Sequence, residues 1–487
     1  MMIATVLNMI PKIYNDKLES KCVRLLYFFN STDTYFLVTG ILSFILVFRG
    51  MFNPIALLLS FCFAAAAAKI ADFYPIFLLF GIPAFVISGC ALNIHPAFVM
   101  SLLIVNIALF FIIHFVFMGI PNAIVARDAR VPFIMAYNSL FTVAPTTISL
   151  SMSIFYSFYL SFLMTAGASC RSVRDYLWLG SAVVILLFGA FISRLMLPKN
   201  IFSASHKPDI TQNGIFKKIV ILNIDGVRKD VFDSLNLPAM NRLTKEGASH
   251  ALGLETVYRA LTNPAFASIL TGTTPRFHGI RNNNFGQSIK TEGLPDVVPT
   301  IVYGSMHVKH FCKDYWETRV VSLPRYSAYR CDDMVLDWLK DDMLGRSEIR
   351  LFILDFSEAD FLAHAYGSKS SQYKQGLRNT DKRIGDFIEW MEIKGFLDNT
   401  AVIVCSDHGV AGIDHSYLIA DSERYVPFFI YGRNIRKGFL IRRPGKIMDI
   451  CSTTAYLLGI RYPAGSRGQV FAEVLDGPEL SAGKYPV

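Results

Sequence analysis

The residues best suited to chemistry are acids and histidines that follow short apolar runs in the second half of the chain. They occur in the segments IVILNID, LFILDFSEADFLAH and AVIVCSDHGVAGIDH, and the candidates are Asp225, Asp360, His364, Asp407, His408 and His415. Carboxylate oxygens and imidazole nitrogens are the ligands that zinc and similar divalent metals take. With one more ligand from a nucleophile, this set is about large enough for two metal ions. One ion would activate an attacking hydroxyl and the other would hold the leaving oxygen.

A threonine in the stretch LTNPAFASILTG is the candidate nucleophile. Thr262 stands two residues before Pro264, which is suited to the first turn of a helix. The free N–H groups of such a helix would face an anion. The Thr262 hydroxyl therefore has two candidate roles. It caps the helix, or it binds a metal, loses its proton and attacks phosphorus.

Taken singly, each candidate ligand also has an ordinary structural role. An aspartate after a strand is usually a turn residue, and Asp360 and His364 have the i, i+4 spacing of an exposed helical pair. His415 alone is equally well a loop histidine. The occurrence of all these residues together, in this order, favours a site.

The elements that would position the candidates form an α/β domain. Continuous apolar runs, typical of strands buried on both faces, cover residues 218–224, 350–355, 401–405 and 426–431. A helical pattern covers residues 371–394 and stops at Gly395. We therefore expect a mostly parallel central sheet flanked by helices, with its ligand crevice beyond the carboxyl ends of the strands.

In these motifs, roughly residues 217–470 resemble the alkaline phosphatase superfamily, and most closely its type I phosphodiesterase/nucleotide pyrophosphatase branch. In that branch the nucleophilic Thr lies two residues before a Pro and ten before the Gly of a Thr-Gly pair, and P-x-x-H-G-I and an Asn follow. The residues that keep this spacing are Thr262, Pro264, Thr271, Gly272, Pro275, His278, Gly279, Ile280 and Asn283. Ala265 stands where many members have Asn, which weakens any transfer of nucleotide specificity.

The resemblance implies an alkaline-phosphatase-like fold and two divalent metal ions, zinc or else manganese. One ion would be held by Asp225, Thr262, Asp407 and His408. The other would be held by Asp360, His364 and a third histidine, for which His415 is expected because no other histidine follows His408. This short spacing is similar to that of the ethanolamine-phosphate transferases of glycolipid anchor synthesis.

The resemblance also implies a pocket for the charge on the phosphate. Asn283 would donate to a non-bridging oxygen beside the Thr262 backbone N–H, although Asn282 and Asn284 leave the register open by one residue. Residues near the motif ends have either a substrate contact or a surface role, and these are Tyr258, Arg259, Arg281 and Tyr366.

The first half of the chain has the composition of a membrane domain. The whole sequence of 487 residues is 53% hydrophobic and only 17% charged, which is too apolar for an ordinary soluble protein. Candidate spans cover residues 34–47, 52–68, 73–92, 97–120 and 176–197. Residues 131–168 are ambiguous between a helical hairpin and an amphipathic pair at the membrane surface. We expect a cytoplasmic segment at 1–33, a transmembrane domain of five or seven helices at 34–198, a linker at 199–216 and a catalytic domain at 217–487.

The Lys and Arg residues that flank these spans predict the orientation. Arg127 and Arg130, like those before the first span, would lie in the cytoplasm, and the catalytic domain would then be extracytoplasmic, in a periplasm or at the cell exterior. The net charge of +9 forms no basic stripe, so nucleic acid is not an expected partner and anionic lipid is. In an exported domain, Cys312 and Cys331 form a disulfide or remain two free thiols.

These features predict a membrane-anchored phosphodiesterase or phosphoric ester hydrolase that acts on a phosphoester, such as a phospholipid or a nucleotide. The alternative is a transferase that moves a lipid-derived phospho group to an envelope glycan or lipid. The architecture is similar to that of the bacterial phosphoethanolamine and phosphoglycerol transferases. A sulfatase is disfavoured because no cysteine opens the pattern C-x-P-x-R. A catalytically dead membrane scaffold would have lost ligands, and all of them are present.

Overall fold

The computed structural model describes residues 115–139, 214–283, 287–415 and 420–476, with a few single residues between 100 and 208. The described residues fall into two compact units. The first unit holds residues 124–129 and the described residues from 207 onward, and the second holds residues 115–123 and 130–139. The expected cytoplasmic segment, most of the expected spans and most of the linker lie outside the described residues.

The first unit is built on an eight-stranded sheet with the order β10-β2-β9-β7-β1-β6-β4-β5. The strands are β1 Lys218–Ile224, β2 Ala248–His250, β4 Thr300–Ser305, β5 Glu317–Val321, β6 Leu351–Phe356, β7 Thr400–Cys405, β9 Phe428–Tyr431 and β10 Phe439–Ile441. The five strands from β7 to β5 run parallel, and β9 is antiparallel to both of its neighbours. A second, antiparallel pair joins β3 Leu254–Glu255 to β8 Tyr425–Val426. The predicted mostly parallel sheet is confirmed.

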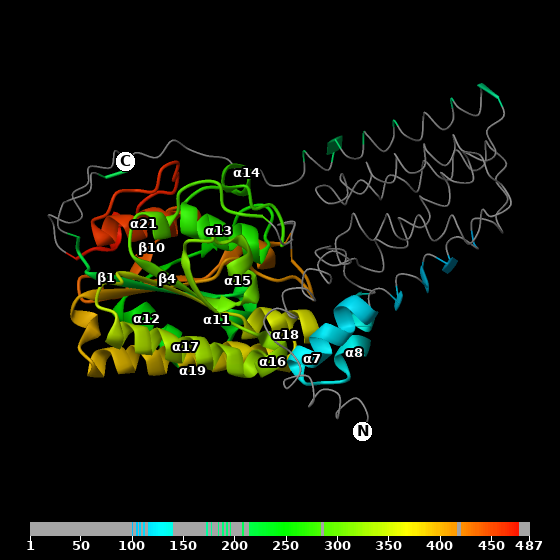
Figure 1. Ribbon diagram of the computed structural model, residues 1–487, viewed down its shortest axis with the longest axis horizontal. Helices are drawn as coiled ribbons and strands as arrows, with labels where there is room; N and C mark the ends of the chain where they lie inside the picture. Colours follow the sequence, from blue (N-terminus) through cyan, green and yellow to red (C-terminus); the bar gives the residue numbers. More distant parts are fainter. Residues whose placement is uncertain are drawn as a thin grey trace. The chain divides into compact units, whose positions relative to one another are not determined.

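Helices cover both faces of this sheet, as Figure 1 shows. One face carries α11 Lys229–Ser234, α12 Pro238–Glu246, α17 Ala328–Gly345, α18 Glu358–Tyr366 and α19 Ser371–Ile393. The other carries α13 Thr262–Thr271, α14 Pro275–His278, α15 Met306–Phe311 and α21 Met448–Leu458. Shorter segments connect these elements, namely η3 Leu294–Asp296, α16 Leu323–Tyr326, η4 Phe396–Asp398, α20 Asp421–Arg424 and η5 Ala472–Val474.

The continuous apolar run of β1 reflects burial on both faces. Ile219 and Ile221 belong to the hydrophobic core on the α13 side, and Val220 and Leu222 belong to the core on the α19 side. Alternate side chains of a strand point to opposite faces, so a strand covered by helices on both faces needs apolar residues at every position. This accounts for the success of the strand predictions at β1, β6 and β7.

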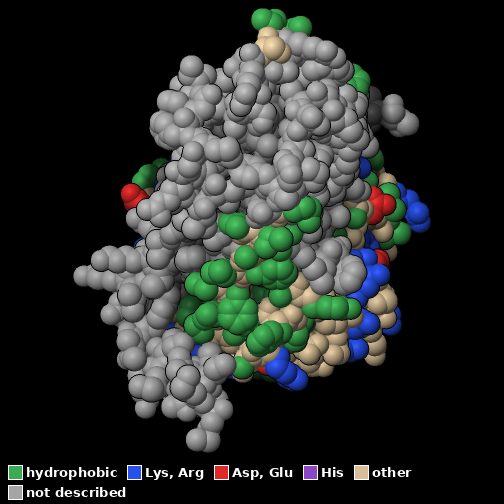
Figure 2. All heavy atoms as spheres, turned by 90° about the vertical axis from the view of Figure 1, so that its right-hand side faces the viewer, with side chains coloured by type: hydrophobic (Ala, Val, Ile, Leu, Met, Phe, Trp, Pro, Cys, Tyr) green, Lys and Arg blue, Asp and Glu red, His purple; other side chains and the backbone are tan. Residues whose placement is uncertain are grey.

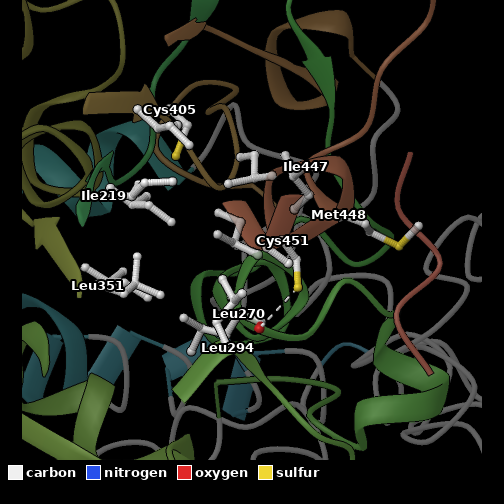
Figure 3. Close-up of a cluster of buried hydrophobic side chains, with 14 of the residues drawn as sticks. Ile219, Leu270, Leu294, Leu351, Cys405, Ile447, Met448 and Cys451 are labelled. Atoms are coloured by element: carbon white, nitrogen blue, oxygen red, sulfur yellow. Dashed lines mark hydrogen bonds between the residues drawn. The ribbon is translucent and has the colours of Figure 1, made fainter. Parts of the chain in front are cut away.

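The helix that begins at Thr262 is held rigidly by its surroundings. Every residue of α13 is buried, and Leu270 packs in one core with Leu294 and Met448 (Figure 3). In the same view Cys451 lies against this helix, and its thiol donates to the Leu270 carbonyl at 3.6 Å. The close packing fixes the start of α13 relative to the sheet.

The proposed Cys312–Cys331 disulfide is absent. Both residues are free, buried thiols. Cys312 belongs to the core on the α13 side of the sheet and Cys331 to the core on the α19 side, so the sheet separates them. Burial raises the pKa of the Cys312 thiol.

The described elements of the second unit are η2 Phe115–Gly119, the first residues of α7 Ile120–Ala126, and α8 Val131–Ser139. Phe115 and Phe133 meet edge to face, with ring centroids 5.6 Å apart. Phe133 and Tyr137, one turn apart on α8, are 68% and 63% exposed, and Figure 2 shows hydrophobic side chains gathered on the face it draws. Among the described residues, no helix has the length and hydropathy needed to cross a bilayer.

Shortening a side chain in the α13 core should destabilise the fold. Leu270 is fully buried, so Leu270→Ala leaves a cavity and should cost about 2–5 kcal/mol of unfolding free energy. Leu252 is 68% exposed, and Leu252→Ala should change stability by less than about 0.5 kcal/mol. Denaturant unfolding of the full chain in detergent measures both. Equal midpoints for the two variants would contradict the packing described for α13.

Candidate active site

Three neighbouring parallel strands deliver the candidate ligands to one edge of the sheet. Asp225 directly follows β1, Asp360 lies in the first turn of α18 after β6, and Asp407 and His408 follow β7. Strands β7, β1 and β6 are adjacent and parallel, so their carboxyl ends meet. The crevice beyond these ends is the usual place for a ligand in an α/β sheet.

The first cluster of ligands forms around His408. Its Nε2 atom lies 3.2 Å from Asp225 Oδ1 and 3.4 Å from Asp407 Oδ2. The Oγ1 atom of Thr262 lies 3.2 Å from the same Nε2. The four residues expected to share one metal are therefore brought together.

The second cluster forms around Asp360. Its Oδ2 lies 3.2 Å from His364 Nε2, and its Oδ1 lies 3.7 Å from His415 Nε2. The Nε2 atoms of His364 and His415 are 3.2 Å apart. The rings of His408 and His415 stack with centroids 3.7 Å apart, so the two clusters adjoin. Despite its short spacing from His408, His415 reaches the expected position.

All three histidines are held in the orientation that a metal ligand needs. The Nδ1 atom of each lies within hydrogen-bonding distance of a backbone carbonyl, namely Ile413 O for His364, Gly409 O for His408 and Ala260 O for His415. A carbonyl only accepts, so Nδ1 carries the proton and Nε2 presents a lone pair to the cluster. This is the tautomer that coordinates a cation.

The carboxylates have the unsatisfied charge that a cation would neutralise. Asp225 Oδ1, Asp360 Oδ1 and Asp407 Oδ2 are buried atoms without a hydrogen-bond partner. Burial, and then the charges of Asp407 and Asp360, raise the pKa of Asp225. Burial likewise raises the pKa of Asp407 to about 6. A nearby divalent cation would remove this repulsion, so the donor set fits bound metal.

The side chain of Thr262 does not cap the helix. Thr262 is the first residue of α13, Leu261 occupies the cap position, and no side chain makes a cap hydrogen bond there. Its hydroxyl instead faces His408. The start of a helix attracts anions through its free N–H groups and its dipole. The hydroxyl therefore lies where a phosphate would be held.

Among the described asparagines of this stretch, Asn283 faces the helix start. Asn283 Oδ1 accepts from the backbone N–H of Asn263 at 3.0 Å, which leaves its Nδ2 group to donate elsewhere. This contact holds the Asn283 side chain beside the helix start, where the expected phosphate pocket includes the Thr262 N–H. Asn282 Oδ1 instead accepts from Gln287 Nε2, and Asn284 lies outside the described residues.

A third group of candidate ligands adjoins the first cluster and was not predicted. It contains Asp225, His307 and Asp355, with His307 Nε2 3.2 Å from Asp355 Oδ2, although neither atom makes a hydrogen bond. Asn223 donates to Asp355 Oδ1 at 2.7 Å. Asp355 is the last residue of the predicted strand LFILD, so its place at a strand end could have identified it as a candidate ligand. His307 has no comparable signal because β4, which precedes it, was not predicted.

Another missed residue positions α18. Asp332 is buried, and it accepts hydrogen bonds from the backbone N–H groups of Ser357 and Glu358 at the start of that helix. Burial raises the pKa of Asp332 to about 7. Asp332 occurs inside an amphipathic helical pattern, where a carboxylate is normally solvated, so no sequence signal indicates this role.

Removal of metal should destabilise the protein. A saturating cation stabilises the folded state by about 4 kcal/mol when its concentration is 1,000 times Kd, so chelation should lower the thermal midpoint of the full chain. Asp360→Asn should lower the bound metal measured by elemental analysis. Asp449→Asn, which alters a buried carboxylate bonded to the Lys446 and Gln469 backbone, should not. Equal metal content in both variants would contradict the assignment.

Comparisons with known proteins agree with this geometry. A family model described as type I phosphodiesterase / nucleotide pyrophosphatase matches residues 219–292 and 294–428. The chain is 28% identical over 279 residues to the human GPI ethanolamine phosphate transferase 2, catalytic subunit, covering 54% of this chain and 28% of that protein. It is 24% identical over 275 residues to the human bis(5'-adenosyl)-triphosphatase ENPP4, covering 48% of this chain and 56% of that protein.

Similarity to solved structures is also found, at low sequence identity. Murine ectonucleotide pyrophosphatase / phosphodiesterase 5 is 14% identical, with a TM-score of 0.42 over 50% of this chain and 96% of that one. The chain spans less than two thirds of the transferase and of the triphosphatase. In residues 219–292 and 294–428, which hold Thr262 and all the candidate ligands of both clusters, the chain is therefore similar to the type I phosphodiesterase / nucleotide pyrophosphatase family.

Proposed function

We propose that this chain is a metal-dependent phosphodiesterase in which Thr262 is the nucleophile. The observation that carries the proposal is the position of the Thr262 hydroxyl. It lies at the start of a buried helix, 3.2 Å from His408, beside two adjoining clusters of carboxylates and histidines. An anion attracted to the helix start would meet the hydroxyl directly.

Two divalent metal ions, zinc or else manganese, are part of the proposal. Asp225, Asp407 and His408 would hold one ion together with Thr262, and Asp360, His364 and His415 would hold the other. When bound, such ions lower the pKa of a coordinated hydroxyl and neutralise charge on phosphate oxygens. The unpartnered carboxylate oxygens and the fixed Nδ1–H tautomers support this assignment.

The reaction proceeds in two displacements at phosphorus. Thr262 Oγ1 forms a bond to phosphorus, the bond to the first ester oxygen breaks, and the hydroxyl proton leaves with the departing alcohol. Water or an acceptor hydroxyl then attacks the phosphothreonine, and Thr262 recovers its proton. Asn283 Nδ2 donates to a non-bridging oxygen in both steps, held by its contact with the Asn263 backbone.

A transferase is the second candidate, and one observation favours it. The match to the human ethanolamine phosphate transferase covers more of this chain than the match to the triphosphatase. In a transferase the hydroxyl of a glycan or lipid would replace water in the second displacement. A catalytically dead scaffold is disfavoured because the candidate ligands converge in space.

We also propose that the apolar first half anchors the catalytic domain to a membrane and that the domain is extracytoplasmic. The support is the hydrophobic composition of residues 34–198 and the placement of Lys and Arg. The phosphoester substrate would then be a phospholipid or a nucleotide, with membrane lipid as a further partner.

Replacing the proposed nucleophile should abolish the covalent intermediate. Thr262→Ala should lower turnover of bis(p-nitrophenyl) phosphate on the order of 10³-fold or more, and Thr262→Ser should retain part of the activity. Intact-protein mass spectrometry with zinc should show an adduct in the wild type and none in Thr262→Ala. Thr271→Ala, at the opposite end of the same helix, is the matched control and should keep the adduct. Undiminished turnover by Thr262→Ala would overturn the proposal.

Asn283 and Asn282 provide a second matched pair. Asn283→Ala removes a donor to the phosphate and should lower kcat by about 10²–10³-fold. Asn282→Ala removes the side-chain oxygen that accepts from Gln287 Nε2 and removes no proposed phosphate donor, so it should leave kcat within about threefold. Steady-state kinetics of both variants tests which asparagine donates to the phosphate. A larger loss of kcat in Asn282→Ala than in Asn283→Ala would contradict the assignment of this role to Asn283.

A further inference from the structure

A short loop from the first half of the chain belongs to the unit that carries the candidate active site. Residues 124–129 are grouped with this unit. Arg127 Nη2 donates to the backbone oxygens of Pro324 and Arg325 at 2.8 and 3.0 Å. Tyr366 Oη donates to Asp128 Oδ2 at 2.9 Å. Two adjacent charged residues are therefore bonded to α16 and α18, which are about 200 residues away in sequence.

The backbone of the loop is shaped for these contacts. Arg127 has φ of 55°, in the left-handed region that a residue other than glycine adopts only when its surroundings hold it there. Its N–H donates to Ile124 O at 3.3 Å. The preceding residues Val125 and Ala126 are buried, and burial lowers the pKa of the Arg127 guanidinium. These features indicate that the contact is a specific part of the fold.

The loop contacts the helix that carries two candidate ligands. Tyr366 is the last residue of α18 and stands two positions after His364. Immediately beyond it, the Ser368 N–H donates to Gly412 O at 2.7 Å, between His408 and His415 in sequence. The end of α18 is thus fixed from one side by Asp128 and from the other by the segment that carries His415.

These contacts disagree with the orientation expected from the Lys and Arg pattern. That pattern placed Arg127 in the cytoplasm and the catalytic domain outside it. A bilayer core is about 30 Å thick, so two groups that share a hydrogen bond cannot lie on opposite sides of it. The two expectations therefore cannot hold together.

We propose that residues 124–129 are a clamp that lies on the same side of the membrane as the active site. Through the Asp128–Tyr366 bond, the clamp positions the end of α18 that carries His364. In this proposal Asp128 and Tyr366 are positioning residues, because they act on His364 through the helix. A second shell of this kind commonly changes metal affinity 10- to 100-fold.

The sidedness is tested with two single cysteines in the full chain. Arg130→Cys marks the exposed residue directly after the clamp, and Lys382→Cys marks the catalytic unit, where that side chain is 76% exposed. Both variants are made in a chain whose four cysteines of the first half are replaced by serine, at Cys22, Cys62, Cys90 and Cys170. A membrane-impermeant maleimide should label both positions in intact cells, or neither until lysis. Labelling of only one position before lysis would overturn the proposal.

The positioning role is tested by zinc affinity, measured by competition with a chromogenic chelator. Asp128→Ala and Tyr366→Phe should each weaken the zinc affinity about tenfold. The double variant should bind zinc as tightly as either single variant, because both substitutions remove the same hydrogen bond. Asp128→Asn keeps an acceptor oxygen and should restore the affinity. Asp337→Ala, at an exposed acid on α17, is the control and should leave it unchanged.

Unchanged zinc affinity in both single variants, or additive losses in the double variant, would overturn the positioning role. Neither labelling nor zinc affinity depends on phosphoester turnover. A failure of this inference would therefore leave the Thr262 reaction intact, and a failure of that reaction would leave the clamp intact.

Discussion

The mutual repulsion of buried carboxylates is the constraint on which the site depends. Asp225, Asp360 and Asp407 meet at the carboxyl ends of three parallel strands, and each has an oxygen without a hydrogen-bond partner. Buried like charges are costly unless they are protonated or compensated. Bound cations would provide the compensation, and in the proposed reaction they would also supply the chemistry that a phosphoester needs. The same carboxylates that repel one another would then make the site reactive.

The rest of the fold holds this costly arrangement in place. Apolar packing against both faces of the sheet fixes the positions of the strand ends, and the burial of α13 fixes Thr262 at the start of that helix. Backbone carbonyls fix the three histidine rings, and Asp332 fixes the beginning of α18. The precision of the site thus comes from neutral hydrogen bonds and packing around the charged groups. None of these supports touches the substrate.

Much of this arrangement was predictable, for identifiable physical reasons. Strands buried on both faces leave an unmistakable apolar signature, which explains the success at β1, β6 and β7. Strands β4 and β5 were missed because polar residues interrupt the apolar pattern of TIVYGS and ETRVV. His307, which follows β4, was missed with it. Strand β8 was merged with β9 because one apolar run, broken by Pro427, continues from the two-stranded sheet into the eight-stranded one.

The site was predictable from residue type and spacing, whereas its supports were not. The acids and histidines have few alternative explanations when they occur together, but Asp332 and Asp128 are ordinary acids in sequence. Their contacts join segments 25 and 238 residues apart, and no local pattern encodes such a pairing. The structure was also required to exclude Thr262 as the cap of its helix, because a cap and a nucleophile both favour a threonine at this position.

The central claim is that Thr262 attacks phosphorus to form a covalent intermediate. The stereochemical course of the reaction tests it most directly, with a phosphodiester made chiral at phosphorus by isotopic oxygen or by sulfur. Each in-line displacement inverts phosphorus, so the two-step reaction predicts net retention of configuration in the product. Net inversion would show a single displacement by water or by the acceptor, and would contradict the assignment of Thr262 as the nucleophile.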